Sequence, residues 1–140
     1  VGPYDSAKPK YVKELKQLIQ NYRLGERIEF YDAVNDIRDI YFMSDIVFNL
    51  SSKPEPFGRT LLEAAMMGKK ICGWNRGGAG EVLDICYPEG KVVFGDFKLL
   101  SDKVKYLIES ENVPDNVYLT SDLMHAKTVS FYLDALEDIS

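Results

Sequence analysis

Two glutamates on either side of a glycine stand out in the sequence as groups able to bind a hydroxyl-rich anion. Glu55 lies in a loop that contains two prolines, and Glu63 lies a little over one turn into the helix predicted over residues 59–67. Gly58 stands where the loop meets this helix, and because it has no Cβ a ligand can approach the backbone closely. The free amide groups of a helix N-terminus attract phosphate. Carboxylates beside such an anion site can accept hydrogen bonds from hydroxyls, so the layout suits a nucleotide sugar.

Each of these residues also has a simpler interpretation. Glu63 follows Arg59 by four positions, and a solvent-facing ion pair of about 0.3 to 0.5 kcal/mol accounts for that spacing. Glu55 between two prolines can be an ordinary loop charge. The glycines within 77–80 can do no more than turn the chain between a strand and a helix. The local pattern leaves both interpretations open, and the combination of the two segments favours a binding site.

Strand and helix patterns alternate along the chain. Apolar residues at helical spacing predict helices, whereas alternating or continuous apolar runs with polar boundaries predict strands. The predicted elements are a helix over 10–24, a strand over 27–31, a short helix after Asp36, a strand over 46–50, a helix over 59–67, a strand over 71–74, a short helix over 81–85, a strand over 91–94, and helices over 97–110 and 119–139. This alternation predicts an α/β fold, a Rossmann-like parallel sheet flanked by helices.

Ligands of such a sheet bind beyond the carboxyl ends of its strands. The loops over 32–35, 51–58 and 75–80 follow predicted strands, so we expect them to converge on one crevice. That crevice would collect both glutamates and the glycine-rich turn. The single histidine, His125, falls in the predicted C-terminal helical region and is left out of the site.

Length, composition and charge exclude several classes of protein. The 140 residues are 46% hydrophobic, enough for one domain with a core of its own. The 17 Lys and Arg against 22 Asp and Glu give a net charge of -5, which disfavours nucleic acid and anionic membrane surfaces as partners. The apolar runs are too short for a transmembrane segment. Cys72 and Cys86 are too few for a disulfide framework, so we interpret them as reduced packing residues of a cytoplasmic protein.

The stretch from Ser51 to Val82 resembles a known family. Its segments Ser-Ser-Lys-Pro-Glu-Pro-Phe-Gly, Leu-Leu-Glu-Ala and Gly-Gly-Ala-Gly-Glu-Val are similar to the C-terminal, donor-binding domain of the group-1, family 4-like glycosyltransferases, which are retaining enzymes of the GT-B fold. The resemblance runs from Val1-Gly2 to the end of the last predicted helix. It implies that residues 1–140 form a nucleotide-sugar-binding domain, a fragment of a longer two-domain enzyme, with the first strand of the domain truncated.

The resemblance also implies roles for the residues of the paired-glutamate segment. Glu55 would be the catalytic carboxylate, in contact with hydroxyls of the transferred sugar. Glu63 would hold the ribose of the nucleotide. The backbone amides that face the sugar and the diphosphate would be those of Phe57, Gly58, Arg59 and Thr60.

Two further groups of residues are implied around the same crevice. Tyr31 and Val34 would belong to the backbone that lines the base. Gly77 and Gly78, together with Glu81, would shape the floor of the crevice below the sugar. Both groups lie outside the paired-glutamate segment, so the resemblance supports them less strongly.

The chain departs from the family pattern at several places. The arginine and lysine that clamp the phosphates, and the acceptor-binding N-terminal domain, would lie upstream of the first residue. Asp32 stands where the family commonly has glycine, and Lys70 stands where it has proline. The base therefore stays open among uracil, guanine and adenine. We find no Asp-x-Asp motif placed in the crevice, in agreement with the metal-independent chemistry, without a cofactor, that the family suggests.

These features predict hexosyl transfer from a UDP-, GDP- or ADP-sugar, with retained configuration, to a glycan or lipid-linked acceptor held by the N-terminal domain. The 140 residues alone are expected to bind the donor weakly without turnover, because the groups that stabilise the leaving diphosphate are incomplete. The full-length protein could attach peripherally to a membrane. The alternative function is a non-catalytic nucleotide-sugar-binding or regulatory module. A receiver-type domain is disfavoured, because such a domain needs acidic residues at the carboxyl ends of its first and third strands. Here Asp45 precedes the strand over 46–50, and Leu50-Ser51 ends that strand.

Overall fold

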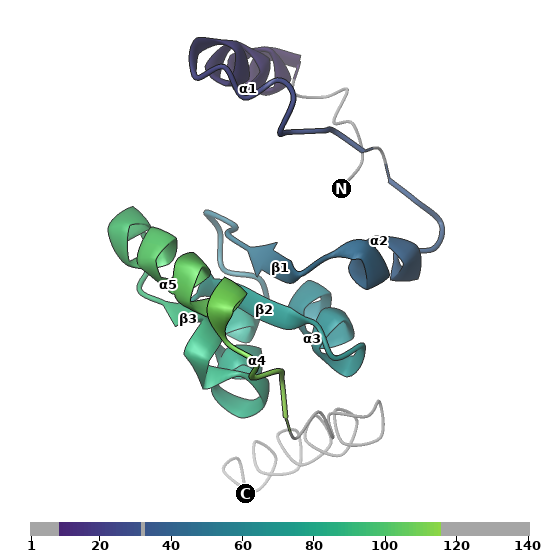
Figure 1. Ribbon diagram of the computed structural model, residues 1–140, viewed down its shortest axis with the longest axis vertical. Coiled ribbons are helices and arrows are strands. Elements are labelled where there is room, and N and C mark those ends of the chain that lie inside the picture. The colour runs from purple at the N-terminus through teal and green to yellow at the C-terminus, as the bar shows by residue number, and fades with distance from the viewer. Residues whose placement is uncertain (1–8, 32, 116–140) are drawn as a thin grey trace, which may run out of the picture. The chain divides into compact units, whose positions relative to one another are not determined.

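The computed structural model describes residues 9–31 and 33–115, and the chain divides into two compact units, Val1–Asp39 and Ile40–Ser140 (Figure 1). The predicted helix over 119–139 lies outside the described residues. The second unit contains the sheet and both glutamates, so it is the unit that positions the candidate site. No helix within the described ranges is long and apolar enough to cross a membrane.

In the first unit, helix α1 runs from Pro9 to Asn21, close to the predicted bounds. The strand predicted over 27–31 is wrong, because these residues form no ladder in the structure. Alternation of polar and apolar residues produces a strand only when a neighbouring strand supplies hydrogen-bond partners. The apolar side chains of this segment are instead exposed, with Phe30 47% exposed. The short helix predicted after Asp36 is confirmed as α2, Arg38–Met43. The boundary between the two units falls within this helix, after Asp39.

The second unit contains a parallel sheet of three described strands in the order β1-β2-β3. These strands are β1 (Ile46–Asn49), β2 (Lys70–Trp74) and β3 (Lys91–Val92), and the register pairs Asn49 with Gly73. The helices are α3 (Arg59–Met66), α4 (Gly77–Cys86), the 3-10 turn η1 (Pro88–Gly90) and α5 (Phe97–Glu109). Helices α3 and α4 cover one face and α5 lies across the other (Figure 1). The predicted α/β class is therefore confirmed.

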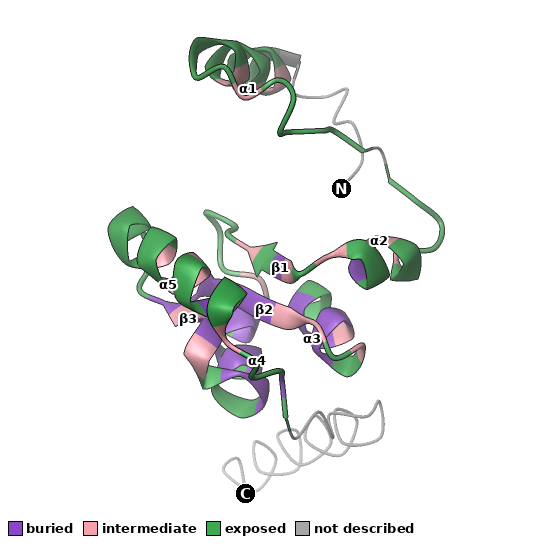
Figure 2. Ribbon diagram, viewed as in Figure 1, coloured by how far each residue is buried: buried purple, intermediate pink, exposed green. Residues whose placement is uncertain are grey.

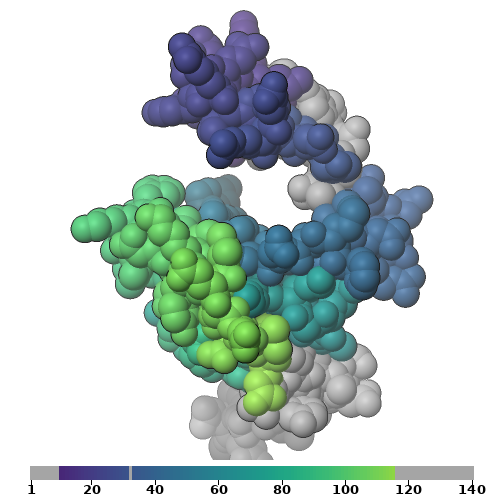
Figure 3. Space-filling view, in the orientation of Figure 1, coloured from purple at the N-terminus to yellow at the C-terminus, as the bar shows by residue number. Residues whose placement is uncertain are grey.

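The core lies between this sheet and its helices, where the buried residues concentrate (Figure 2). Helix α5 forms one part of the near surface of the second unit in the space-filling view, beside the blue and teal segments that precede it in the chain (Figure 3). Helices α3 and α4 supply most of the buried helical residues, as expected for helices that pack on a sheet, whereas α5 buries only Leu107. The largest fully buried side chains are Leu61, Ile71, Leu83, Leu107, Val92 and Cys72.

Both cysteines are free thiols buried in this core, which confirms their interpretation as packing residues. Burial raises the pKa of Cys72 to about 11, and it also raises the pKa of Cys86. The thiolate is the nucleophile, and with this pKa only about one thousandth of the Cys72 side chains are ionised at pH 8. A disulfide reagent such as DTNB should titrate both thiols promptly in guanidinium and very slowly in the native protein. Fast reaction of the native thiols would contradict this packing.

Lys70 holds the end of helix α5. Its Nζ donates hydrogen bonds to the carbonyl oxygens of Leu107 at 2.7 Å and Ser110 at 2.5 Å. These carbonyls lie at the negative end of the helix, where a cation is stabilising. We expect Lys70→Met to lower the free energy of unfolding by about 1.5 kcal/mol. The control is Lys98→Met near the start of α5, expected to change it by less than about 0.5 kcal/mol in urea unfolding. Equal effects of the two variants would contradict the capping role.

Candidate functional site

The carboxyl ends of β1 and β2 bring together two of the three loops predicted to converge. The loop over 51–58 follows β1, and the residues that follow β2 begin the 75–80 segment. Tyr31 and Val34 belong to the first unit, where they are 49% and 41% exposed, and their role toward the base stays a prediction. Residue 32 lies outside the described residues. The second unit therefore contains the residues predicted to contact sugar, diphosphate and ribose.

The two loops contact each other backbone to backbone through glycines. The amide of Gly78 donates a hydrogen bond to the carbonyl oxygen of Glu55 at 2.8 Å. A Cβ on Gly78 would lie 2.5 Å from the backbone nitrogen of Phe57, and a Cβ on Gly58 would lie 2.6 Å from the carbonyl oxygen of Gly78. Both distances are far below van der Waals contact. Gly58 and Gly78 therefore permit the close approach of the two loops. Their role is not limited to turning the chain between a strand and a helix.

The glycine-rich segment differs from its prediction in one respect. A turn over 75–80 followed by a short helix over 81–85 is predicted, but helix α4 already begins at Gly77. Gly77 has a φ of +56°, and a Cβ there would lie 2.7 Å from the carbonyl oxygen of Glu55. Sequence propensity disfavours helix at glycine, and the tertiary contact with the preceding loop overrides that preference. Gly77 and Gly78 thus support the Glu55 loop from the first turn of α4.

Glu55 is held by both its backbone and its side chain. Its carboxylate oxygen Oε1 accepts a hydrogen bond of 2.6 Å from the amide Nδ2 of Asn49, the last residue of β1. A small cavity beside Glu55 is also lined by Lys53 and Arg76. Its volume is about 10 Å³, which is room for about one water molecule. Arg76 also stacks its guanidinium 4.0 Å above the ring of Phe94. Glu55 is therefore an oriented, half-buried carboxylate rather than a loose loop charge.

Glu63 is shared between an exposed and a buried partner. Its Oε1 lies 3.6 Å from Nη2 of Arg59, so the simple i,i+4 ion pair is present, with Arg59 77% exposed. Such an exposed pair contributes little to stability. On the other side, the hydroxyl of Tyr41 donates to Oε2 at 3.2 Å. The ion pair and a binding role for Glu63 are compatible, since the same carboxylate faces the start of α3.

Tyr41, like Asn49, is a residue of this site that the sequence analysis did not single out. Its place in a short amphipathic helix indicates only a packing residue, and it is 5% exposed. Burial, with a smaller contribution from the charge of Glu63, raises the pKa of Tyr41 to about 12, so the phenol stays a neutral donor. A buried tyrosine needs a partner for its hydroxyl, which is the only sequence-level signal available.

The start of helix α3 offers backbone donors between the two carboxylates. Gly58 precedes the helix with a φ of 60° and provides no side-chain cap. The amides of Arg59 and Thr60 belong to the first turn, where backbone N–H groups lack helical acceptors. Phe57, 60% exposed, borders this turn. An anionic group can therefore bind at these amides, in a segment with one carboxylate in the loop before the helix and another one turn into it.

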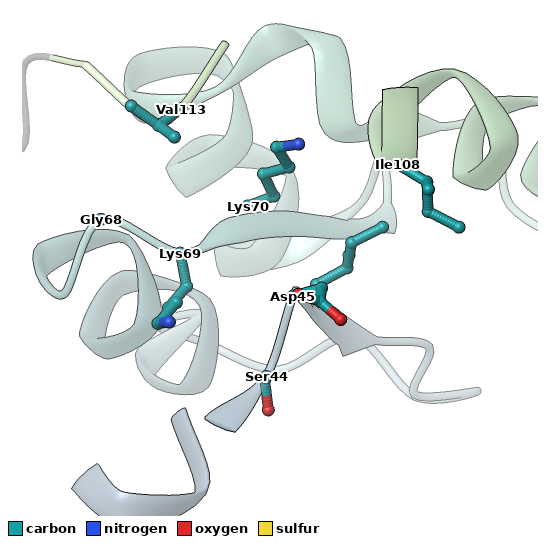
Figure 4. Close-up of a pocket in the computed structure, with 8 residues that line it drawn as sticks. Ser44, Asp45, Gly68, Lys69, Lys70, Ile108 and Val113 are labelled. Carbon is teal, nitrogen blue, oxygen red and sulfur yellow. The ribbon is translucent and has the colours of Figure 1, made fainter. Parts of the chain in front are cut away.

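A larger pocket lies at the opposite, amino-terminal edge of the strands (Figure 4). Its volume is about 440 Å³, and it gathers none of the predicted site residues. Its two lysines already have partners, since Nζ of Lys69 donates to the carbonyl oxygen of Phe42 at 2.7 Å and Lys70 caps α5. Its lining residues are Ser44, Asp45, Ile46, Gly68, Lys69, Lys70, Ile108 and Val113. Pocket volume alone does not identify the predicted site, since a further pocket of about 530 Å³ is lined by residues 86–89 and 111–115.

Side chains able to hold a metal do not cluster within the part of the chain that the structure describes. Glu55 and Glu63 each have a neutral hydrogen-bond donor, Asn49 and Tyr41 respectively. Each carboxylate oxygen has two lone-pair sites, so both groups can accept further hydrogen bonds, Glu63 in addition to its ion pair with Arg59. This arrangement suits neutral hydroxyl groups on a ligand whose negative charge lies at the start of α3.

Comparison with known proteins gives a consistent result at the level of sequence. The family described as glycosyl transferases group 1 matches residues 1–118. N-acetyl-alpha-D-glucosaminyl L-malate synthase of Bacillus anthracis is 28% identical over an alignment of 132 residues that covers 87% of this chain and 34% of that protein. The GPI3 subunit of phosphatidylinositol N-acetylglucosaminyltransferase of Saccharomyces cerevisiae is 28% identical over 126 residues, 89% of this chain and 26% of that protein. The chain thus spans about a third or less of these relatives.

Solved structures with the same arrangement of elements include two bacterial proteins. HepE of Anabaena, in complex with UDP and glucose, superposes with a TM-score of 0.70 at 31% identity, covering 78% of this chain and 30% of that one. A glycosyltransferase of Rickettsia africae superposes with a TM-score of 0.67 at 31% identity, covering 74% of this chain and 27% of that one. The Anabaena protein has also been solved with UDP-glucose.

Proposed function

We propose that this chain, which belongs to the group 1 glycosyl transferases, binds a UDP-sugar as the donor-binding part of a retaining hexosyltransferase. The observation that carries the proposal is the uncapped start of α3 between two hydrogen-bonded carboxylates, Glu55 in the loop before the helix and Glu63 one turn into it. A nucleotide sugar has the matching sequence of groups: a ribose with hydroxyls, a diphosphate and a sugar with hydroxyls.

Each part of the donor has a group of the chain suited to it. The diphosphate would accept hydrogen bonds from the amides at Gly58, Arg59 and Thr60, helped by the positive end of the helix. Glu63, held by Tyr41, would accept hydrogen bonds from the ribose hydroxyls. Glu55, the proposed catalytic carboxylate, would accept them from the sugar and keep its anomeric carbon in place for transfer. Gly77 and Gly78 would support this sugar site from below, because they hold the backbone of the Glu55 loop.

Uracil is the base that we favour among the three that the sequence leaves open. The support is the Anabaena structure, 31% identical to this chain and solved with UDP and glucose. This chain covers 34% and 26% of the two relatives, which supports the proposal that another domain of the full-length enzyme binds the acceptor, a glycan or a lipid-linked acceptor. Electrostatic stabilisation of the leaving diphosphate is usually the largest catalytic contribution. The 140 residues alone are thus expected to bind donor without transferring sugar.

Ligand-observed NMR tests the proposal directly. The chain would be mixed with the UDP, GDP and ADP forms of glucose and mannose, because this method detects millimolar binding to a partial site. Preferential binding of the UDP-sugars, competed by UDP, is the expected result. Preference for a guanine or adenine nucleotide would overturn the base assignment alone. Absence of binding to every nucleotide sugar, repeated with the full-length protein, would overturn the proposed function.

A further inference from the structure

Asn49 connects the central sheet to the carboxylate of Glu55. As the last residue of β1, it is fixed by the parallel ladder, where it pairs with Gly73. The contact between these strands is tight, since a Cβ on Gly73 would lie 2.7 Å from the carbonyl oxygen of Asn49. The side chain of Asn49 is half-buried and reaches 2.6 Å from Oε1 of Glu55. A rigid strand end therefore holds a carboxylate that belongs to a loop.

The two ends of the Asn49 amide have different partners, which fixes its orientation. Nδ2 donates to Glu55, whereas Oδ1 accepts a hydrogen bond of 3.2 Å from the backbone amide of Ser51. A rotation of the amide by half a turn would place Oδ1 against the carboxylate and Nδ2 against an amide donor, and both contacts would become repulsive. Only one orientation satisfies all four groups. The amide is thus preorganised as a donor to Glu55.

This contact determines which part of Glu55 remains available. Oε1 already accepts from Asn49, and the backbone carbonyl already accepts from Gly78. Within the described part of the chain Oε2 accepts no hydrogen bond, so both of its lone-pair sites can accept from a ligand, whereas Oε1 retains one. Because the donor is a neutral amide, this contact adds no positive charge beside the carboxylate, and an aspartate at position 49 would repel it.

We infer that Asn49 is a positioning residue that directs the Glu55 carboxylate toward the hydroxyls of the donor sugar. The inference rests on the proposed function for its ligand, and on the two hydrogen bonds of Asn49 for its geometry. It predicts that Asn49 affects recognition of the sugar and leaves recognition of the nucleotide unchanged, because Glu63 and the start of α3 have no hydrogen bond with it in this arrangement.

The test compares the affinities of the chain for UDP-glucose and for UDP by calorimetry or NMR titration. Asn49→Asp keeps the size of the side chain and an acceptor for Ser51, but turns the donor toward Glu55 into a repulsive oxygen. The UDP-glucose affinity is expected to fall about tenfold while that for UDP stays within about twofold. A parallel loss of both affinities would show a merely structural role and overturn the inference.

Asn112 provides a matched control. Its Nδ2 donates to Oε1 of Glu89 at 2.9 Å, which is the same kind of contact on an exposed part of the second unit away from the site. Asn112→Asp is expected to change neither affinity by more than about twofold. If it lowers UDP-glucose affinity as much as Asn49→Asp does, the effect reflects added charge, and the inference fails.

A ligand-free measurement separates this inference from the proposed function. The side-chain amide signals of Asn49 in a nitrogen-15 correlation spectrum are identified by their loss in Asn49→Asp. In Glu55→Ala they should move and exchange faster with solvent, because the acceptor is gone. Unchanged signals would overturn the inference even if UDP-glucose binds. If the signals change but the chain binds no nucleotide sugar, the contact between Asn49 and Glu55 exists and the proposed function is wrong. The sugar-directing role of Asn49 then fails with it.

Discussion

Glu63→Ala is expected to weaken UDP binding by about 10- to 100-fold, the largest functional effect of any substitution considered for this site. Hydrogen bonds to a charged group contribute about 1.5 to 3 kcal/mol, and this variant removes the acceptor of the ribose hydroxyls. The measurement is a titration of the chain with UDP. Affinity equal to that of the unsubstituted chain would refute the ribose assignment.

The variant also removes a structural contact, so stability must be measured beside affinity. Glu63→Ala leaves the hydroxyl of the buried Tyr41 without its carboxylate acceptor. Tyr41→Phe removes that hydroxyl while retaining Glu63, and it should therefore reduce UDP affinity far less than Glu63→Ala does. Glu109→Ala, in the exposed last turn of α5, is the control for loss of one negative charge. A drop in affinity for Glu109→Ala of the same size would attribute the effect to net charge.

Gly78→Ala is expected to cost about 3 kcal/mol of unfolding free energy, because its methyl group would overlap the backbone of the preceding loop. Its Cβ would lie 2.5 Å from backbone atoms of Phe57 and from the carbonyl oxygen of Pro56. Backbone atoms of a loop that is itself hydrogen bonded to α4 cannot rotate away as a side-chain tip can. The measurement is urea unfolding of Gly78→Ala and of the unsubstituted protein at the same pH.

The matched control for this substitution is Gly25→Ala. A Cβ at Gly25 would meet nothing within 4 Å, so the same chemical change should alter stability by less than about 0.5 kcal/mol. If Gly78→Ala unfolds like Gly25→Ala, the loops do not approach each other as described. If Gly78→Ala folds stably but no longer distinguishes UDP-glucose from UDP, the contact supports the site more than the fold.

Local pattern in the sequence predicted most of the described helices and the strands at the centre of the sheet, whereas the start of α4 at Gly77 was missed. Helix α3 begins at Arg59 as predicted, because apolar spacing, a preceding glycine and the loop signals before it all act within a few residues. The strand over 46–50 is equally local, being a short apolar run between polar residues. Alternation of these elements then predicts the parallel sheet and the edge at which we propose that the donor binds.

Tertiary structure alone decided how the site is supported. The contacts of Asn49 with Glu55, Tyr41 with Glu63, and Gly78 with the Glu55 loop join residues on different elements. Each depends on the register of the parallel strands and on the packing of helices against them, which no periodicity in the sequence encodes. The strand predicted over 27–31 failed for the related reason that its hydrogen bonds require a neighbour. The sequence thus determined which groups are present, and packing determined which way they point.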